Sequence, residues 1–212
     1  MNKAVLSNEE LLANAEHPLN TDWKYEGARL INLAWFKPLH CVRFRTTNNV
    51  PEQGPMIIAP NHVSYYDPPL IAAGIKWRVR FMAWDALFRV PVLRKILISY
   101  GAYPIKLKTA DKGAIVQTLK ILRNGEAVMI FPEGTRSHDR TVAEFKPGAF
   151  QAALAAGADV LPVALEGTGA VLPPGGFFRV RPGTIRVRIG TPIAVAGRDR
   201  QALAQEARAQ VL

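Results

Sequence analysis

The segment "MIIAPNHVSYYDPPLIAAGI", residues 56–75, decides the fold that we predict for this chain. Its first four residues are apolar and come directly before a proline and a polar loop, a pattern typical of a short strand. Asp67 then precedes Pro68, and this pair is a typical helix start, because aspartate caps free N–H groups and proline fits the first helical position. The segment therefore predicts a strand at residues 56–59, a polar loop, and a helix at residues 68–75.

The same alternation of short strands and helices continues along the chain and favours a largely parallel sheet flanked by helices. The expected strands are residues 41–45, 56–59, 79–84, 102–105, 127–131, 160–165 and 185–189. The expected helices are residues 68–75, 85–99 with a kink at Pro91, 111–123 and 147–156, and a last helix from about Asp199. We therefore expect an α/β fold: a single domain with a mostly parallel, partly mixed central sheet flanked by helices, preceded by an N-terminal helical segment.

That N-terminal segment, residues 1–40, is predicted to precede a catalytic domain of residues 41–212. A capping box at Ser7 opens a first helix, and a second helix runs from about Asp22 to Phe36. Apolar residues, two tryptophans among them, crowd the second helix. This helix is either docked on the core or a membrane-surface anchor with its tryptophans at the depth of the lipid headgroups.

The chain is strongly basic, with a formal net charge of +10. Such a charge favours nucleic acid, anionic lipid headgroups, or acidic small molecules such as coenzyme A as partners. Bases alternate with aromatic and apolar residues in segments 76–95 and 177–188, a mixture that suits a lipid interface. The alternative is that both segments are half-buried strands with solvated outer faces. Nucleic acid is the remote alternative, because the sequence has no helix-turn-helix, RNA-binding sheet signature or zinc spacing.

Other features exclude several classes of protein. The one cysteine, Cys41, cannot form an internal disulfide or a cysteine-based zinc cluster, and we expect it to be a small buried hydrophobic residue. No apolar run approaches the roughly 20 residues that span a bilayer, and acids stand where a signal peptide has its apolar core. We therefore expect no transmembrane span, no metal and no cofactor, and a peripheral or monotopic protein at the cytoplasmic side of the cell membrane.

Two groups of polar side chains follow predicted strands, where ligands bind in sheets of this kind. In the first, His62 precedes Asp67 by five residues. Asp67 could serve only as a helix N-cap, or its second oxygen could orient His62 as a base that takes a proton from a hydroxyl. The second is "FPEGTRS", residues 131–137, where Gly134 lets a ligand approach the backbone and Arg136 offers a fork that matches phosphate. The alternative there is a surface turn with an internal pair between its glutamate and its arginine.

Three ordered motifs carry a resemblance to a known family: Asn61-His62-x-x-x-x-Asp67, residues 131–137, and "VLPVALEGT" at residues 160–168. They resemble the glycerophospholipid acyltransferase family, of the 1-acyl-sn-glycerol-3-phosphate (lysophosphatidic acid) acyltransferase type, over roughly residues 50–191. The resemblance implies that His62 is the general base, that Asp67 orients it, and that the acceptor hydroxyl attacks an acyl thioester directly. In agreement, the chain lacks the G-x-S-x-G elbow of a serine esterase.

The resemblance also implies which residues bind the substrates. Glu133, Gly134, Thr135 and Arg136 match the family's acceptor-binding motif, in which the arginine would hold the glycerol phosphate. Pro162 lies in the family's last block, which is linked to acyl-donor binding or to the shape of the pocket.

One block departs from the family's pattern. Within "GAYPIKLK", residues 101–108, Leu107 stands about where the family commonly has an arginine that helps to hold the phosphate. Lys106 and Lys108 are the candidate replacements, although lysine lacks the bidentate fork of arginine. The departure leaves the identity of the acceptor headgroup open.

The sequence therefore predicts an O-acyltransferase that moves a fatty acyl chain from acyl-CoA or acyl carrier protein to the free hydroxyl of lysophosphatidic acid, giving phosphatidic acid. An alternative keeps this chemistry on another acceptor: another lyso-lipid, glycerol 3-phosphate, an amino-acid lipid or a glycolipid. The expected partners are the acyl donor, a lysophospholipid and an anionic membrane surface, but no nucleic acid.

Overall fold

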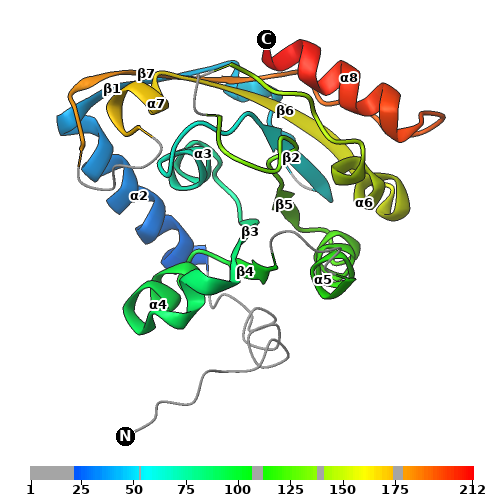
Figure 1. The fold of residues 1–212 in the computed structure, drawn as a ribbon, viewed down its shortest axis with the longest axis horizontal. Coiled ribbons are helices and arrows are strands. Elements are labelled where there is room, and N and C mark those ends of the chain that lie inside the picture. Colours follow the sequence, from blue (N-terminus) through cyan, green and yellow to red (C-terminus); the bar gives the residue numbers. More distant parts are fainter. Residues whose placement is uncertain (1–21, 53, 107–111, 138–140, 174–178) are drawn as a thin grey trace, which may run out of the picture.

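The computed structural model describes residues 22–52, 54–106, 112–137, 141–173 and 179–212. These residues form a seven-stranded sheet in the order β1-β7-β6-β2-β5-β3-β4 (Figure 1). The strands are β1 His40–Arg45, β2 Met56–Pro60, β3 Val79–Trp84, β4 Ala102–Ile105, β5 Ala127–Met129, β6 Asp159–Glu166 and β7 Gly183–Ile189. All neighbours pair in parallel except β6 and β7, which are antiparallel. The predicted α/β fold with a mostly parallel, partly mixed sheet is confirmed.

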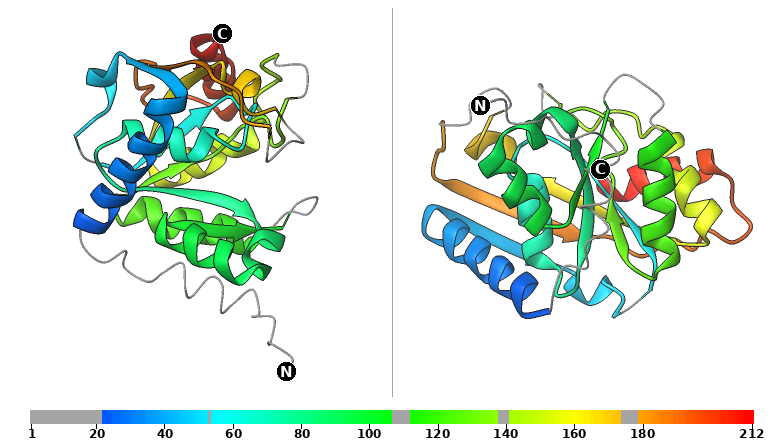
Figure 2. Two further views of the ribbon diagram at one scale, coloured as in Figure 1. Left: turned by 90° about the vertical axis from the view of Figure 1, so that its left-hand side faces the viewer. Right: turned by 90° about the horizontal axis from the view of Figure 1, so that it is seen from below.

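Helices cover both faces of the sheet (Figure 2). They are α2 Asp22–Leu39, α3 Asp67–Gly74, α4 Pro91–Ser99, α5 Lys112–Arg123, α6 Gly148–Ala156, α7 Thr168–Val171 and α8 Arg200–Val211, with short 3-10 turns η1 Thr47–Asn49 and η2 Asp85–Arg89. Buried side chains of α2, α3 and α7 pack on one face, together with η2 and partly buried residues of α4. Those of α5, α6 and α8 pack on the other face.

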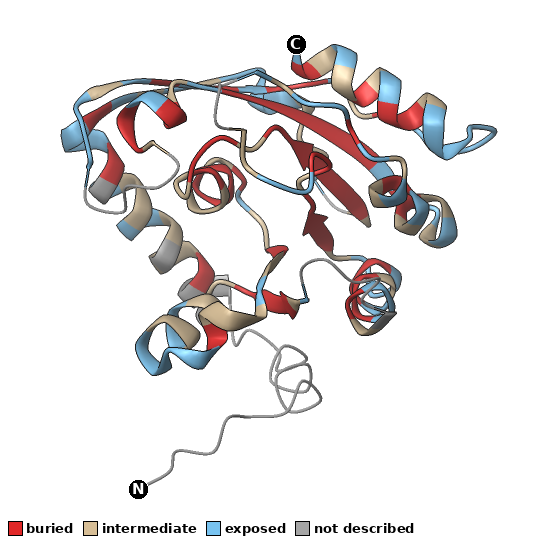
Figure 3. Cartoon of the chain, viewed as in Figure 1, coloured by how far each residue is buried: buried red, intermediate tan, exposed pale blue. Residues whose placement is uncertain are grey.

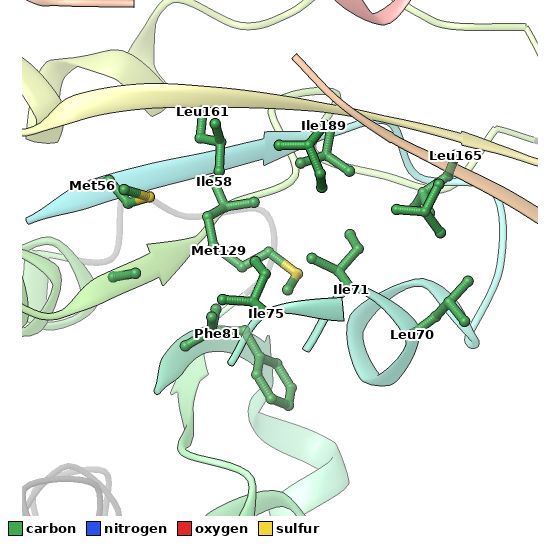
Figure 4. Packing of buried hydrophobic residues seen from close by; sticks show 14 of the residues in the cluster. Met56, Ile58, Leu70, Ile71, Ile75, Phe81, Met129, Leu161, Leu165 and Ile189 are labelled. Carbon is green, nitrogen blue, oxygen red and sulfur yellow. The ribbon is translucent and has the colours of Figure 1, made fainter. Parts of the chain in front are cut away.

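Strand β2 lies in the interior of the sheet, and every one of its residues is buried. Successive strand side chains point to opposite faces, so Met56 and Ile58 enter one core layer while Ile57 and Ala59 enter the other. Figure 4 shows Ile58 packed close to Met129 of the neighbouring strand, and Figure 3 shows buried residues along the central strands and on the inner sides of the helices. Burial of each such isoleucine stabilises the fold by about 2 kcal/mol.

Apart from shifts in the ends of elements, two predictions of local structure were wrong. Residues 85–99 form not one kinked helix but η2 and then α4, with Val90 extended between them (φ −87°, ψ 114°). A proline disfavours the helical conformation in the residue before it, so Pro91 starts a new helix. Cys41 is exposed rather than buried, because His40 takes the buried side of β1 and side chains alternate along a strand.

Helix α2 is docked on the core. The Tyr25 hydroxyl donates to the carbonyl of Ala72 at 3.2 Å, and Phe36 is buried in the core layer beneath α3. The first predicted helix, from Ser7, lies outside the described residues, and so do the side chains of the two tryptophans. Within the described part of the chain, no helix is both long and apolar enough to cross a membrane.

The two basic-aromatic segments lie differently in the fold. Segment 76–95 contains β3, an interior strand whose first three residues are buried, and continues through η2 into α4. In the described part of segment 177–188, the predicted alternation is present: Ile185 and Val187 are buried, whereas Arg186 and Arg188 are exposed. The second segment is therefore half-buried strand at its C-terminal end.

Candidate functional site

The site is centred on the loop that joins the carboxyl end of β2 to α3. His62 Nδ1 lies 2.9 Å from Asp67 Oδ2. The same carboxylate oxygen accepts hydrogen bonds from the backbone N–H groups of Val63 at 2.8 Å and Ser64 at 2.7 Å. Because an ionised carboxylate only accepts, Nδ1 carries the proton of the neutral imidazole, and Nε2 keeps a free lone pair.

One interpretation of the sequence made Asp67 the N-cap of α3. In the structure, Asp67 does not act as that cap. Its side chain is fully buried and turns back toward the loop instead of toward the free N–H groups of the helix. Its second oxygen, Oδ1, has no hydrogen-bond partner among the described residues. The two backbone bonds hold the carboxylate in place against His62, so the loop conformation and the His–Asp pair depend on each other.

Asn61 and Ser64 attach this loop to the neighbouring segment of the chain. The Asn61 side chain accepts from the N–H of Leu165 at 2.7 Å and donates to the carbonyl of Leu165 at 3.0 Å, at the end of β6. The Ser64 hydroxyl donates to the carbonyl of Leu172 at 2.9 Å. Both side chains are buried, so these bonds position the residues on either side of His62 with little freedom.

Phe131 contacts the catalytic candidate His62, a role that the sequence analysis did not predict. Its ring stacks on the His62 imidazole with the ring centroids 3.8 Å apart and the planes at 25°. It can do so because β5 ends at Met129, two residues earlier than predicted. The stacking fixes the plane of the imidazole, and 18% of the His62 side chain stays exposed to a substrate. An aromatic residue at the end of a predicted buried strand, next to a polar loop, was the only available signal.

Glu133 anchors the two loops to each other. Its Oε1 accepts from the backbone N–H of His62 at 2.7 Å, and its Oε2 accepts from the N–H of Ala143 at 3.0 Å. Burial raises the pKa of the Glu133 carboxyl, and the two backbone N–H donors offset only part of that rise. Glu133 and Arg136 form no ion pair with each other in the described part of the chain, so the alternative interpretation of a surface turn with an internal pair does not hold.

Arg136 is held by stacking. Its guanidinium carbon lies 3.6 Å from the centroid of the Tyr65 ring, in a cation–π contact. Its Nη1 is buried and has no hydrogen-bond partner among the described residues. Next to it, Gly134 and Thr135 are exposed, and Gly134 has a left-handed φ of 74°. The loop thus presents bare backbone, a hydroxyl and an arginine beside the histidine.

The remaining predicted site residues lie elsewhere. Lys106 is exposed and follows β4, and since β5 and β3 lie between β2 and β4, it is three strands away from His62. Leu107 and Lys108 lie outside the described residues. Pro162 is buried within β6, and its carbonyl accepts from the N–H of Gly190 at 2.8 Å. The structure therefore brings together His62, Asp67 and the 131–137 loop, but not Lys106.

The fold and this site can be compared with known proteins. The family model described as "Acyltransferase" matches residues 41–166, which contain His62, Asp67 and the 131–137 loop. The chain belongs to the acyltransferase family. The predicted family is thereby confirmed.

This member of the acyltransferase family is 32% identical over 180 residues to a chloroplastic 1-acyl-sn-glycerol-3-phosphate acyltransferase of Arabidopsis thaliana, a match that covers 82% of the chain and 49% of that protein. It is 28% identical to a lyso-ornithine lipid O-acyltransferase of Pseudomonas aeruginosa, with 79% and 70% covered. The crystal structure of the 1-acyl-sn-glycerophosphate acyltransferase of Thermotoga maritima is similar with a TM-score of 0.79 and 26% identity, covering 88% of the chain and 76% of that structure. The chain spans about half the length of the plant and algal relatives that it matches.

Proposed function

We propose that this chain is an O-acyltransferase that moves a fatty acyl chain from acyl-CoA or acyl carrier protein to the free hydroxyl of lysophosphatidic acid, giving phosphatidic acid. The observation that carries the proposal is the His62–Asp67 pair, with Nδ1 and Oδ2 2.9 Å apart and Asp67 fully buried. The relatives named as 1-acyl-sn-glycerol-3-phosphate acyltransferases support the choice of acceptor.

In the proposed reaction, His62 Nε2 takes the proton of the acceptor hydroxyl as its oxygen attacks the thioester carbonyl. The C–O bond of the new ester forms, the C–S bond breaks, and the thiolate leaves and takes up the proton from His62. Asp67 holds the Nδ1 proton and stabilises the imidazolium that forms in between. Thiolate is a good leaving group, so the step needs no covalent acyl-enzyme.

The phosphate of the acceptor is assigned to the 131–137 loop. Arg136 has a buried Nη1 without a partner among the described residues, and a guanidinium fork matches phosphate oxygens. A second candidate acceptor is a lyso-lipid with another headgroup. It is favoured by the absence of the family's arginine at Leu107 and by the similarity to the lyso-ornithine lipid enzyme.

The proposal includes a membrane surface on the cytoplasmic side, with residues 1–40 as its anchor and residues 41–212 as the catalytic domain. On α2, Leu30 and Ile31 are exposed, the latter by 69%, and on α4, Val92 is 71% exposed. The Tyr100 hydroxyl, just after α4, donates to Asn32 of α2 at 3.3 Å, so the end of α4 lies beside α2 (Figure 1). Exposed apolar side chains on adjacent helices, with bases among them, suit a lipid interface.

The deciding experiment incubates purified protein with palmitoyl-CoA or palmitoyl-ACP and a panel of lysolipids in mixed micelles, and identifies the products by mass spectrometry. We expect phosphatidic acid from lysophosphatidic acid, and a rate at least about a hundredfold lower for His62→Ala, since general-base catalysis contributes 10²–10⁴-fold. Acylation of lyso-ornithine lipid alone would favour the second acceptor. A His62→Ala variant that works at the wild-type rate would refute the mechanism.

A further inference from the structure

Lys146 lies against the loop to which the acceptor phosphate is assigned. A Cβ atom built on Gly134 would lie 2.7 Å from Lys146 Nζ and 3.3 Å from Lys146 Cε. The ammonium group therefore rests on the backbone of Gly134, where any side chain would displace it. Neither the motifs nor the charge pattern of the sequence singled out this lysine.

The backbone of Lys146 is held on both sides. Its N–H donates to the carbonyl of Pro132 at 3.0 Å, and the preceding Phe145 is buried in the core layer formed with α6. Helix α6 begins at Gly148, two residues later, without a side-chain cap on its first N–H groups. The N–H groups of Ala149 and Phe150 donate to the carbonyls of Lys146 and Pro147, both at 3.1 Å, so the first turn of the helix also fixes the backbone of Lys146.

Positive charge is in excess around Gly134 among the described residues. Arg136, two residues after the glycine, has an unpartnered buried Nη1, and Lys146 forms no ion pair with any residue that the structure describes. Both oxygens of Glu133 are occupied by backbone N–H groups. Two cations beside exposed backbone at a glycine form a site for a phosphate dianion.

We propose that Lys146 is a specificity-determining residue that binds a substrate phosphate together with Arg136, and so supplies the cation that Leu107 does not. The inference rests on the proposed function. The phosphate is that of the lipid acceptor or one of those of the CoA donor, and Lys106, three strands away from His62, is not needed for it. Lys146 takes no part in proton transfer, so its effect falls on substrate binding.

The test compares Lys146→Gln, which removes the charge, with Lys146→Arg, which keeps it. Lys76→Gln is the matched control. Lys76 is exposed and comes just before β3, at the amino ends of the parallel strands, whereas the site lies at their carboxyl ends. Lysophosphatidic acid is varied at saturating palmitoyl-CoA, and then palmitoyl-CoA at saturating acceptor. We expect Lys146→Gln to raise one KM about tenfold, the effect of one charge-assisted hydrogen bond, with kcat changed less than about twofold. Lys146→Arg and the control should stay near the wild type.

A rise in KM for lysophosphatidic acid alone assigns the acceptor phosphate to this site, and a rise for palmitoyl-CoA alone assigns the donor phosphate. An unchanged KM for both substrates would overturn the proposal. Calorimetric titration with sn-glycerol 3-phosphate separates this outcome from a failure of the proposed function. If the wild type proves inactive as an acyltransferase, binding of this probe that is about tenfold weaker in Lys146→Gln still supports the site. The same titration with coenzyme A tests the donor phosphate, and the proposal is overturned when neither probe binds the wild type more tightly than it binds Lys146→Gln.

Discussion

Glu133 accepts a hydrogen bond from the backbone N–H of His62 at 2.7 Å, although 71 positions separate the two residues in the sequence. The bond joins the loop after β5 to the loop after β2, and the N–H of Ser137 closes the same junction by donating to the carbonyl of His62 at 2.8 Å. The backbone of the proposed base is thus fixed from both sides. Glu133 acts on the position of His62, and its oxygens are not directed toward an acceptor.

Replacing Glu133 by Gln should therefore impair turnover more than acceptor binding. The amide accepts one N–H but places its own NH₂ against the other, which leaves a buried donor unsatisfied at a cost of about 1–3 kcal/mol in unfolding free energy. We expect a lower melting temperature and a lower kcat with a nearly unchanged acceptor KM. Glu144→Gln, at an exposed position of the same connection, is the control. A rise in acceptor KM at constant kcat would show instead that Glu133 contacts the acceptor.

The same pair of proteins tests the electrostatics of the site. Burial raises the pKa of Glu133 above its ordinary value of 4.5, so the folded state holds this proton at a higher pH than the unfolded state does. The contribution of this group to stability is full below 4.5 and is lost as the pH rises through the raised pKa. We expect the melting-temperature difference between wild type and Glu133→Gln to narrow as the pH is raised from below 4.5 to neutrality. A difference that widens would contradict the raised pKa.

Asn61→Ala should lower the free energy of unfolding more than the loss of a single polar side chain usually does. It removes two hydrogen bonds to Leu165 and leaves a buried N–H and a buried carbonyl unpaired, a loss of about 3 kcal/mol. Urea unfolding measures this loss. Asn49→Ala is the control, because Asn49 makes one bond, to the carbonyl of Ile189, from a partly exposed turn, and its removal should cost about 1 kcal/mol or less. Equal losses would mean that the Asn61 bonds contribute no more than a surface contact.

Tyr65 should influence the binding of the acceptor by holding the Arg136 guanidinium in place. Tyr65→Leu removes the ring on which the guanidinium stacks, and a cation–π contact of about 1 kcal/mol corresponds to roughly a fivefold higher KM for lysophosphatidic acid. Tyr65→Phe keeps the ring face and should retain the wild-type KM. Steady-state kinetics of both variants decide the point, and identical values for Leu and Phe would exclude a role for the stacking.

The membrane surface can be tested with charge substitutions that spare the core. Ile31→Asp on α2 and Val92→Asp on α4 place a carboxylate at strongly exposed apolar positions, so the fold should persist. We expect each substitution to lower the partition coefficient onto anionic vesicles, measured by sedimentation, about tenfold. Burying one such apolar side chain in the lipid is worth about 1.5–3 kcal/mol. Ile115→Asp, exposed on α5 on the other face of the sheet, should bind like the wild type. Equal losses in all three would place the lipid contact elsewhere.

Much of the fold could be predicted because its signals are local. The expected strands at residues 79–84 and 102–105 coincide with β3 and β4, since apolar runs and their flanking turn residues define a strand without reference to the rest of the chain. Cys41 was mispredicted from its residue type alone. It shares one face of β1 with the exposed Arg43 and Arg45, whereas the other face packs His40 against Phe36 and Tyr66, so the alternation along the strand places Cys41 outward.

The sequence by itself determined the α/β architecture, because its strand and helix signals are local. It also implied the pairing of His62 with Asp67 through the resemblance of three ordered motifs to an acyltransferase family, since the spacing alone equally allowed Asp67 to be an N-cap. Only the tertiary structure decided that Glu133 holds the His62 backbone, that Phe131 stacks on its ring, and that Lys106 lies three strands away. These relationships depend on the order of the strands in the sheet. That order follows from how distant segments bury their apolar faces against each other, a property that no local pattern of residues encodes.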